Sequence, residues 1–160
     1  MPILFQHTIN NNTQLGVWKV EEHESFFTNQ LPALTLPASP HKRLQHLAGR
    51  FLLQYLQPDF PIDQIHALPG KKPFLPEQHY HFSISHSHDV AAAIISNNIP
   101  VGIDIEIIAD KAKRVSPKFI HASEMKWLET AYEKNVHFHA TLFWSIKETI
   151  FKWHGLGNVD

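Results

Sequence analysis

The pattern of apolar and polar residues first predicts short β-strands. Segments in which the two kinds alternate place apolar side chains on one face of a sheet, because successive side chains of a strand point to opposite faces. Three asparagines, residues 10–12, separate the first two segments and predict a tight turn, since asparagine tolerates positive φ. The predicted strands cover residues 2–8, 13–20, 79–85, 90–96 and 99–107. The last three are expected to form an antiparallel meander.

Apolar residues that recur every three or four positions predict amphipathic helices. The predicted helices cover residues 21–30, 41–56, 117–132 and the segment that contains 144–152. Ser116 before Pro117 suits the start of the third helix, as an N-cap followed by a proline in the first turn. Three prolines within residues 31–40 exclude a regular helix there. Helices and antiparallel strands together predict an α+β fold.

Composition narrows the class of protein. The chain has 160 residues, of which 43% are hydrophobic and 18% are charged, an ordinary globular balance. The net charge of −1 gives no broad basic field, so we expect neither nucleic acid nor a membrane surface as a partner. The absence of cysteine excludes disulfides and thiolate chemistry. No apolar run approaches the roughly 18 residues of a membrane span, and we expect a soluble, cytoplasmic protein.

Two carboxylates stand side by side on the last predicted strand. Asp104 and Glu106 are two positions apart, so their side chains share one face. Like charges at that spacing repel each other, and protons, basic side chains or a bound cation could offset them. On the last predicted helix Glu148 and Lys152 are i,i+4 neighbours, and Lys147 lies beside them. A third carboxylate with two lysines suggests a hard divalent cation that holds a phosphorylated ligand.

Three motifs carry most of these residues. In chain order they are Phe82-Ser83-Ile84-Ser85-His86-Ser87, then Gly102-Ile103-Asp104-Ile105-Glu106, then Trp144-Ser145-Ile146-Lys147-Glu148-Thr149-Ile150-Phe151-Lys152. In order and spacing they resemble the signature of 4'-phosphopantetheinyl transferases, more closely the surfactin-type branch. The resemblance covers residues 70–157, roughly half of the chain. It implies an enzyme that transfers 4'-phosphopantetheine from coenzyme A to a serine of an apo acyl or peptidyl carrier protein.

The resemblance implies a metal site for the three carboxylates. Mg²⁺, with Mn²⁺ as a substitute, would bind Asp104, Glu106 and Glu148 and offset the charge of the coenzyme A pyrophosphate. Lys152 would contact the pyrophosphate, and Lys147 would either do the same or assist the base. The alternative is a solvated strand face with a surface ion pair between Glu148 and Lys152.

The resemblance also implies residues that bind the coenzyme and residues that act in catalysis. The coenzyme-binding candidates are Arg43, Arg50, Lys72, Ser85, His86 and Lys152, and the catalytic candidates are Glu124 and Lys147. Arg43 and Arg50 are seven residues apart and are expected on the same side of their helix. Glu124 would accept the proton of the serine, directly or through a metal-bound water. Each candidate also has a plainer interpretation, as a solvated surface charge, an exposed loop residue or a buried histidine.

The family further implies two pseudo-repeated lobes, each a helix packed on a small antiparallel sheet, with the ligand in the cleft between them. Residues 1–100 would form the N-terminal lobe, and residues 101–160 the C-terminal lobe with the metal and phosphate motifs. Because the chain stops earlier than members of this branch, we expect the second lobe to be incomplete. A coenzyme A-binding homologue with weak or no catalysis therefore stays open as an alternative. The protein would be a monomer, or a homodimer that covers an open sheet edge.

Two other clusters have more than one interpretation. Lys111, Lys113, Arg114 and Lys118 form a basic cluster that could face the acidic helix of a carrier protein or be a solvated linker. His79, His81, His86 and His88 include two H-x-H pairs, a spacing that can bind zinc on a strand. No third ligand with clear spacing supports zinc, so magnesium remains the expected metal.

Overall fold

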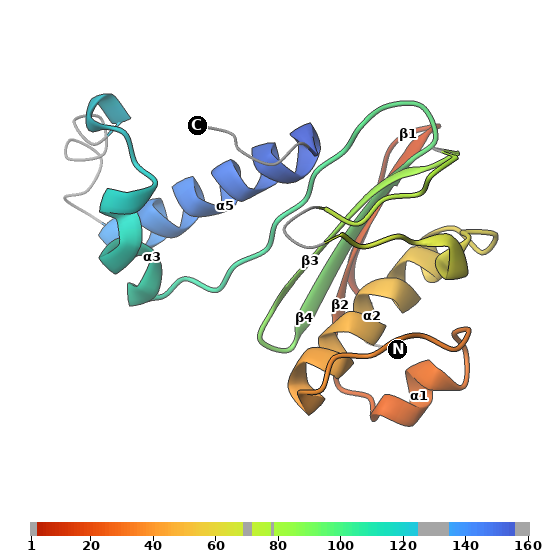
Figure 1. The fold of residues 1–160 in the computed structure, drawn as a ribbon. Helices are drawn as coiled ribbons and strands as arrows, with labels where there is room; N and C mark the ends of the chain where they lie inside the picture. The colour runs from red at the N-terminus through yellow and green to blue at the C-terminus, as the bar shows by residue number, and fades with distance from the viewer. Residues whose placement is uncertain (1–2, 69–71, 78, 125–134, 156–160) are drawn as a thin grey trace.

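The sheet of the protein has four antiparallel strands in the order β1-β2-β4-β3 (Figure 1). The computed structural model describes residues 3–68, 72–77, 79–124 and 135–155. Its strands are β1 Ile3–Asn10, β2 Thr13–Lys19, β3 His81–Ser87 and β4 Val90–Ser96. Its helices are α1 Glu24–Thr28, α2 Pro40–Leu56, α3 Asp110–Val115 and α5 Val136–His154, with 3₁₀ turns η1 Ile62–Gln64 and η2 Ser116–Lys118. The α+β class, the first four predicted strands and the helix predicted over residues 41–56 are confirmed.

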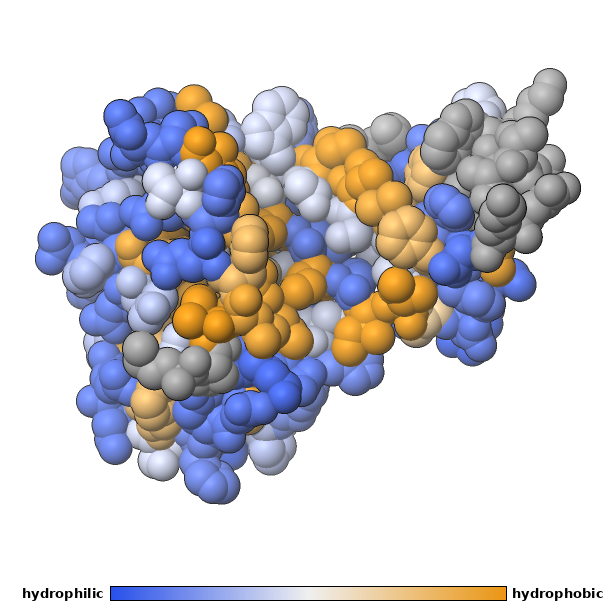
Figure 2. Space-filling view, turned by 180° about the vertical axis from the view of Figure 1, so that it is seen from behind, coloured by the Kyte–Doolittle hydropathy of each residue, from blue (hydrophilic) through white to orange (hydrophobic). Residues whose placement is uncertain are grey.

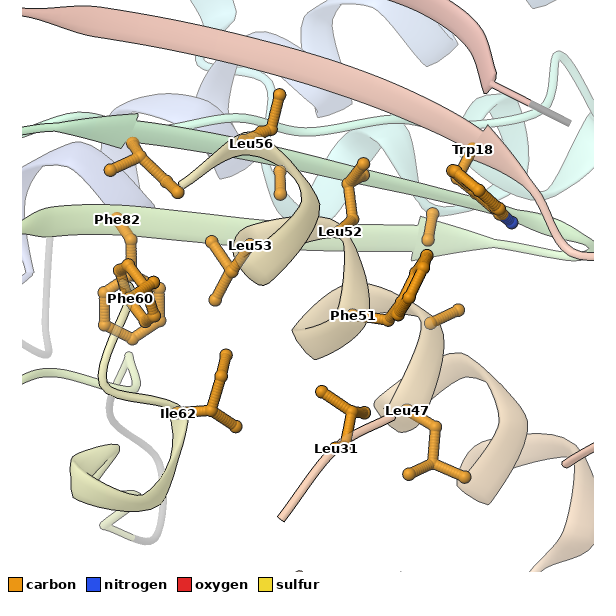
Figure 3. Packing of buried hydrophobic residues seen from close by; sticks show 14 of the residues in the cluster. Trp18, Leu31, Leu47, Phe51, Leu52, Leu53, Leu56, Phe60, Ile62 and Phe82 are labelled. Atoms are coloured by element: carbon orange, nitrogen blue, oxygen red, sulfur yellow. The ribbon is translucent and has the colours of Figure 1, made fainter. Parts of the chain in front are cut away.

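Helix α2 covers one face of the sheet and forms the core with it (Figure 3). Gly49 lets the helix approach β3, because a Cβ at this position would lie 2.5 Å from Cγ2 of Ile84. Trp18 of β2 and Leu52 of α2 are almost fully buried in this interface. Burial of each such side chain contributes roughly 1.5–3 kcal/mol. The interface therefore fixes β3, the strand on which the candidate site is built.

Residues 99–107, predicted as the third strand of a meander, are extended but pair with none of the described strands. The backbone N–H groups of Ile103 and Ile105 instead donate to the hydroxyls of Ser83 and Ser85, each at 3.2 Å. Side chains alternate along β3, so these serines point away from α2. The segment therefore lies over that face of β3, and hydroxyls take the place of a backbone ladder. Periodicity cannot separate these two arrangements, which explains the wrong prediction.

The helix predicted over residues 117–132 begins later than expected. The 3₁₀ turn η2 is followed by a bend, and helical residues resume at 122–124, while 125–132 lie outside the described residues. Ser116, expected as the N-cap, donates its hydroxyl to the carbonyl of Lys113 at 2.8 Å. Its side chain therefore closes the end of α3, and its backbone begins the short turn η2 instead of the long helix that was expected.

Helix α5 lies on the far side of the extended segment from the sheet (Figure 1). Asn135 caps its first turn by accepting from the backbone N–H of Phe138 at 3.3 Å, and Gly155 ends it with φ 73°. Gly102 lies against the last turn, where a Cβ would be 2.7 Å from the backbone nitrogen of Trp153. The glycine of the carboxylate motif thus allows the close approach of α5.

The described part of the second half contains α3, η2 and α5 and no strand of a sheet. The predicted repeat of a sheet with a helix is therefore not confirmed. The boundary at residue 100 and the cleft between two lobes stay predictions. Within the ranges that the structure describes, no helix is long and apolar enough to cross a membrane.

Candidate functional site

Asp104, Lys152 and Ser85 form the centre of the candidate site. The ammonium of Lys152 lies 2.6 Å from Oδ1 of Asp104 and donates to Oγ of Ser85 at 3.0 Å. The hydroxyl of Ser85 donates to the same Oδ1 at 2.8 Å. The side chain of Asp104 is only 3% exposed, so this ion pair is shielded from water. Residues 48 positions apart in the chain are thus brought together.

Glu106 is held by donors from two different elements. The hydroxyl of Ser87 on β3 donates to Oε2 at 3.1 Å, and the indole N–H of Trp144 on α5 donates to Oε1 at 3.2 Å. Ser83, Ser85 and Ser87 alternate along β3 and hold the backbone or carboxylates of residues 103–106. A row of hydroxyls therefore positions the carboxylate motif, which explains why the serines recur at every second residue.

Glu148 is close enough to the other carboxylates to feel their charge. Burial raises the pKa of Glu148, Lys152 opposes the rise, and the negative charges of Asp104 and Glu106 add to it. The three predicted metal ligands therefore lie in one region. A cation bound among them would reverse this effect, because it favours the ionised form of each carboxyl group.

The oxygens of the three carboxylates do not converge on one point. No group of three or more His, Asp or Glu side chains in the described ranges is arranged to hold a metal ion. Lys152 instead supplies the positive charge beside Asp104. The second oxygen of Asp104, Oδ2, is buried and has no hydrogen-bond partner among the described residues. A buried bare carboxylate oxygen next to two more carboxylates is a donor set that suits Mg²⁺.

Lys72 lies beside Lys152. Its ammonium donates to the carbonyl of Val101 at 2.7 Å. Burial, and then the positive charge of Lys152, lower the pKa of Lys72 to about 8. Both lysines line a cavity of about 230 Å³ together with Phe82, Ser83 and Phe151. Two ammonium groups at one small cavity are typical of a site for an anion with several charges.

A second basic cluster lies on the α2 side of β3. Burial, then the charges of Arg50 and His86, lower the pKa of His46 to about 4. Arg50 is 9% exposed, and desolvation also lowers the pKa of His86, although that residue as a whole remains exposed. The sequence analysis predicted Arg50 and His86 but missed His46. Its i,i+4 spacing from Arg50 on α2 is the signal that could have identified it.

Arg43 is not brought to this cluster. Its guanidinium pairs with Glu24 of α1 at 3.1 Å and also donates to the carbonyl of Ala38 at 3.4 Å. These contacts join the start of α2 to α1. Both arginines lie on α2 as expected, but Arg50 is buried whereas Arg43 pairs with Glu24 of α1.

The two catalytic candidates contact each other. The ammonium of Lys147 lies 2.7 Å from Oε2 of Glu124, and the backbone N–H of His121 donates to the same oxygen at 2.7 Å. The bond from Lys147, followed by that from His121, lowers the pKa of Glu124. The contact with His121 is also half of a capping box at the start of the helix at residue 122, so Glu124 has a structural role as well.

A cavity of about 360 Å³ opens next to Glu106, between α2, α3 and α5. Its lining includes three histidines, at positions 41, 86 and 88, together with Trp144 and Thr141. The hydroxyl of Thr141 is buried and has no hydrogen-bond partner among the described residues. His79 and His81 do not line this cavity, so the four histidines considered for zinc do not form one cluster in the described structure.

Comparison with known proteins tests the family resemblance. The family model of the 4'-phosphopantetheinyl transferase superfamily matches residues 100–160. The 4'-phosphopantetheinyl transferase gsp of Aneurinibacillus migulanus is 37% identical over 86 residues, which are 54% of this chain and 35% of that protein. The resemblance to 4'-phosphopantetheinyl transferases is confirmed.

Two further transferases of this superfamily extend the comparison. The 4'-phosphopantetheinyl transferase AcpT of Escherichia coli (strain K12) is 40% identical over 76 residues, 48% of this chain and 38% of that protein. AcpT of Salmonella typhi is 28% identical over 130 residues, 79% of this chain and 67% of that protein. The chain thus spans little more than a third of the length of the gsp and Escherichia coli transferases. The superfamily match covers Asp104, Glu106, Glu148 and Lys152.

Proposed function

We propose that this chain binds coenzyme A with a divalent cation and transfers 4'-phosphopantetheine to a serine of an apo acyl or peptidyl carrier protein. The observation that supports this best is the buried Asp104, which pairs with Lys152 at one oxygen and has no partner at the other among the residues that the structure describes. A buried carboxylate in that state is costly unless a cation completes it. We place the activity in the cytoplasm, in a monomer or a homodimer.

Magnesium is the proposed cation, with manganese as a substitute. Asp104, Glu106 and Glu148 would hold it, since they lie in one region and offer the oxygen ligands that Mg²⁺ prefers. When bound, it supplies positive charge to the pyrophosphate of coenzyme A. Ser87 and Trp144 keep Glu106 in a fixed orientation. This orientation lowers the cost of assembling the site.

The phosphates of coenzyme A are proposed to bind between Lys72, Lys152 and His86. The two lysines line one cavity, and the charge of Lys152 also acts on His86 at the edge strand β3. Arg50 and His46 lie beneath His86 and add charge or donors on the α2 side. Arg43 is the least suited of the coenzyme-binding candidates, because Glu24 already neutralises it.

Glu124 is proposed to accept the proton of the carrier serine, and Lys147 to orient Glu124. The lowered pKa of Glu124 means that the carboxylate is ionised at neutral pH and ready to accept a proton. The same shift makes it a weaker base, so its efficiency depends on orientation more than on proton affinity. The ion pair with Lys147, at 2.7 Å, supplies that orientation.

Binding of coenzyme A without transfer is the second candidate function. Helix α5, which carries Lys147, Glu148 and Lys152, exposes a line of large apolar residues. They are Phe138, Leu142, Ile146, Ile150 and Trp153, each 40–53% exposed. Apolar surface gathers in this part of the molecule in Figure 2. An uncovered helix is held less firmly, and transfer needs a more exact geometry than binding does.

Labelling of carrier proteins distinguishes the two functions. Fluorescently tagged coenzyme A is mixed with a panel of apo carrier proteins, in Mg²⁺ or in EDTA. We expect labelling that depends on Mg²⁺ and is lost in Asp104→Ala, because the buried carboxylate would hold the cation. Asp63→Ala, an exposed aspartate on η1, is the matched control and should label normally.

The opposite result supports the second candidate. If coenzyme A binds by calorimetry but no carrier protein is labelled under any condition, the chain binds the coenzyme without transferring its arm. If coenzyme A does not bind either, both proposals are wrong.

A further inference from the structure

We propose that Lys152 is the counter-ion of Asp104 in the ligand-free protein, and that it moves to the phosphate when a divalent cation takes its place at Asp104. This exchange would couple binding of the cation to binding of the coenzyme. The inference rests on the proposed function, because it assumes that the site takes both a cation and a phosphorylated ligand.

The geometry places Lys152 where a cation would have to bind. Its ammonium lies 2.6 Å from Oδ1 of Asp104. It therefore occupies the place beside this oxygen that a bound divalent cation would take. An ammonium and a divalent cation at the same carboxylate repel each other and compete for the same oxygen. Lys152 therefore already neutralises the carboxylate that the cation would need.

The position of Lys72 explains why Lys152 does not leave unaided. Both lysines line the same small cavity, and the charge of Lys152 contributes to the lowered pKa of Lys72. Movement of Lys152 away from Asp104 and towards Lys72 would increase this repulsion. An anion in the cavity removes the penalty, because it attracts both ammonium groups. A phosphate therefore draws Lys152 away and exposes Asp104 to the cation.

Ser85 keeps Asp104 in place during the exchange. Its hydroxyl donates to Oδ1 of Asp104 and accepts from both Lys152 and the backbone N–H of Ile105. The bonds to Asp104 and Ile105 do not depend on the lysine. The carboxylate therefore keeps its orientation when Lys152 leaves, and its Oδ2 stays available.

The test is the affinity for Mn²⁺, measured by electron paramagnetic resonance of the free ion, with and without saturating coenzyme A. Without coenzyme A, Lys152→Gln should bind Mn²⁺ about tenfold more tightly than the wild type, because one competing charge is gone. With coenzyme A, the same variant should bind Mn²⁺ several-fold more weakly, because the phosphate is held less well. Lys152→Gln thus raises the affinity for Mn²⁺ without coenzyme A and lowers it with coenzyme A, and we call this change of sign the reversal.

Two further variants make the result specific. Lys19→Gln removes an equally close ion pair, 2.6 Å from Glu21 on the surface, and should leave the Mn²⁺ affinity unchanged. Lys152→Arg keeps the charge and offers a bidentate donor to Asp104. It should weaken Mn²⁺ binding in the absence of coenzyme A, and it tests the inference even if Lys152→Gln folds poorly.

The inference is overturned if Lys152→Gln, without coenzyme A, binds Mn²⁺ with unchanged or lower affinity. It is also overturned if no form of the protein binds Mn²⁺. Failure of the proposed transfer is a separate outcome. If the wild-type protein labels no carrier protein but the effect of Lys152→Gln reverses sign, the exchange is supported and the proposed transfer is wrong. If the wild-type protein labels carrier proteins but the effect of Lys152→Gln does not reverse sign, the transfer is supported and the exchange is wrong.

Discussion

The charges of single lysines decide how the candidate site responds to pH. Lys152 faces a buried carboxylate, whereas Lys72 donates to the carbonyl of Val101. A carbonyl carries no full charge and stabilises an ammonium less than a carboxylate does. Burial and the neighbouring Lys152 therefore lower the pKa of Lys72 to about 8. Lys72 loses its charge just above neutral pH, where many assays are run.

We predict that the affinity for 3',5'-ADP falls as the pH rises above about 8. Below this pH Lys72 is an ammonium that attracts phosphate, and above it the amine is neutral. Lys72→Gln should bind about tenfold more weakly at pH 7 and lose no further affinity between pH 7 and pH 9. Calorimetric titration with 3',5'-ADP, which has no thiol, measures both effects.

The control for this prediction is Lys42→Gln, an exposed lysine at the start of α2. It should keep the wild-type affinity and the wild-type pH dependence. Equal pH dependence in Lys72→Gln and the wild type would show that another group is responsible.

At the scale of elements, α5 is the part that completes the site. It supplies Glu148 and Lys152, and its position against the carboxylate segment depends on close contact at Gly102. Trp144 adds a second contact through its bond to Glu106. Both contacts, at Gly102 and at Glu106, are made to the extended segment and not to the sheet. A small displacement of that segment should therefore move its carboxylates and Lys152 of α5 together.

We predict that Gly102→Ala displaces the last turn of α5. The added Cβ would lie 2.7 Å from the backbone nitrogen of Trp153, and backbone cannot rotate away as a side chain can. Overpacking of this kind costs about 1–3 kcal/mol. Urea unfolding should show that loss, and the affinity for 3',5'-ADP should fall as well, because Lys152 moves with the helix.

Gly155→Ala is the matched control. A Cβ there meets nothing within 4 Å, but the φ of 73° makes any other residue cost about 1–2 kcal/mol. Its stability should therefore fall while its affinity for 3',5'-ADP stays normal. If Gly102→Ala binds 3',5'-ADP as tightly as the wild type, the close contact at Gly102 does not position Lys152.

At the scale of the whole molecule, the packing of α2 on the sheet places charged groups inside the protein. His46 of α2 lies close to the buried Arg50 and to His86 of β3. Burial and these two positive neighbours make a proton on His46 unfavourable, and its pKa falls from 6.5 to about 4. The interface that builds the core is therefore sensitive to acid.

We predict that the protein loses stability between pH 6.5 and pH 4 through His46. In this window the unfolded chain binds a proton that the folded chain does not, so the free energy of unfolding falls as the pH falls. The expected loss is about 1–2 kcal/mol, since the ring keeps some contact with solvent, which screens the charge. Urea unfolding at pH 7 and at pH 5 measures the difference.

His46→Gln should remove that part of the pH dependence and change little at pH 7. His79→Gln alters an exposed histidine, whose side chain is 70% exposed, and should behave as the wild type. A pH dependence in His46→Gln as steep as that of the wild type would assign the effect to other histidines.

Local patterns and motifs were enough to predict the four strands of the sheet and its covering helix, and to select the residues that meet at Asp104. Apolar and polar residues alternate over 13–20 and 90–96, and apolar residues recur at helical spacing over 41–56. These are local signals, and packing of the helix on the sheet reinforces them. Asp104, Ser85 and Lys152 were recognised from motifs, because residue type and order carry the chemistry even when contacts are unknown.

The group that neutralises Asp104, and the contacts that hold residues 103–106, could be learned from the folded structure alone. The sequence left protons, basic side chains and a cation open, and Lys152, 48 residues away, proved to be the partner in this state. Hydroxyls of β3, not a strand ladder, hold residues 103–106, and burial of His46 on α2 is the main cause of its low pKa. Periodicity reports which face a residue shares with its near neighbours, whereas charge pairing and desolvation depend on distant segments that folding brings together.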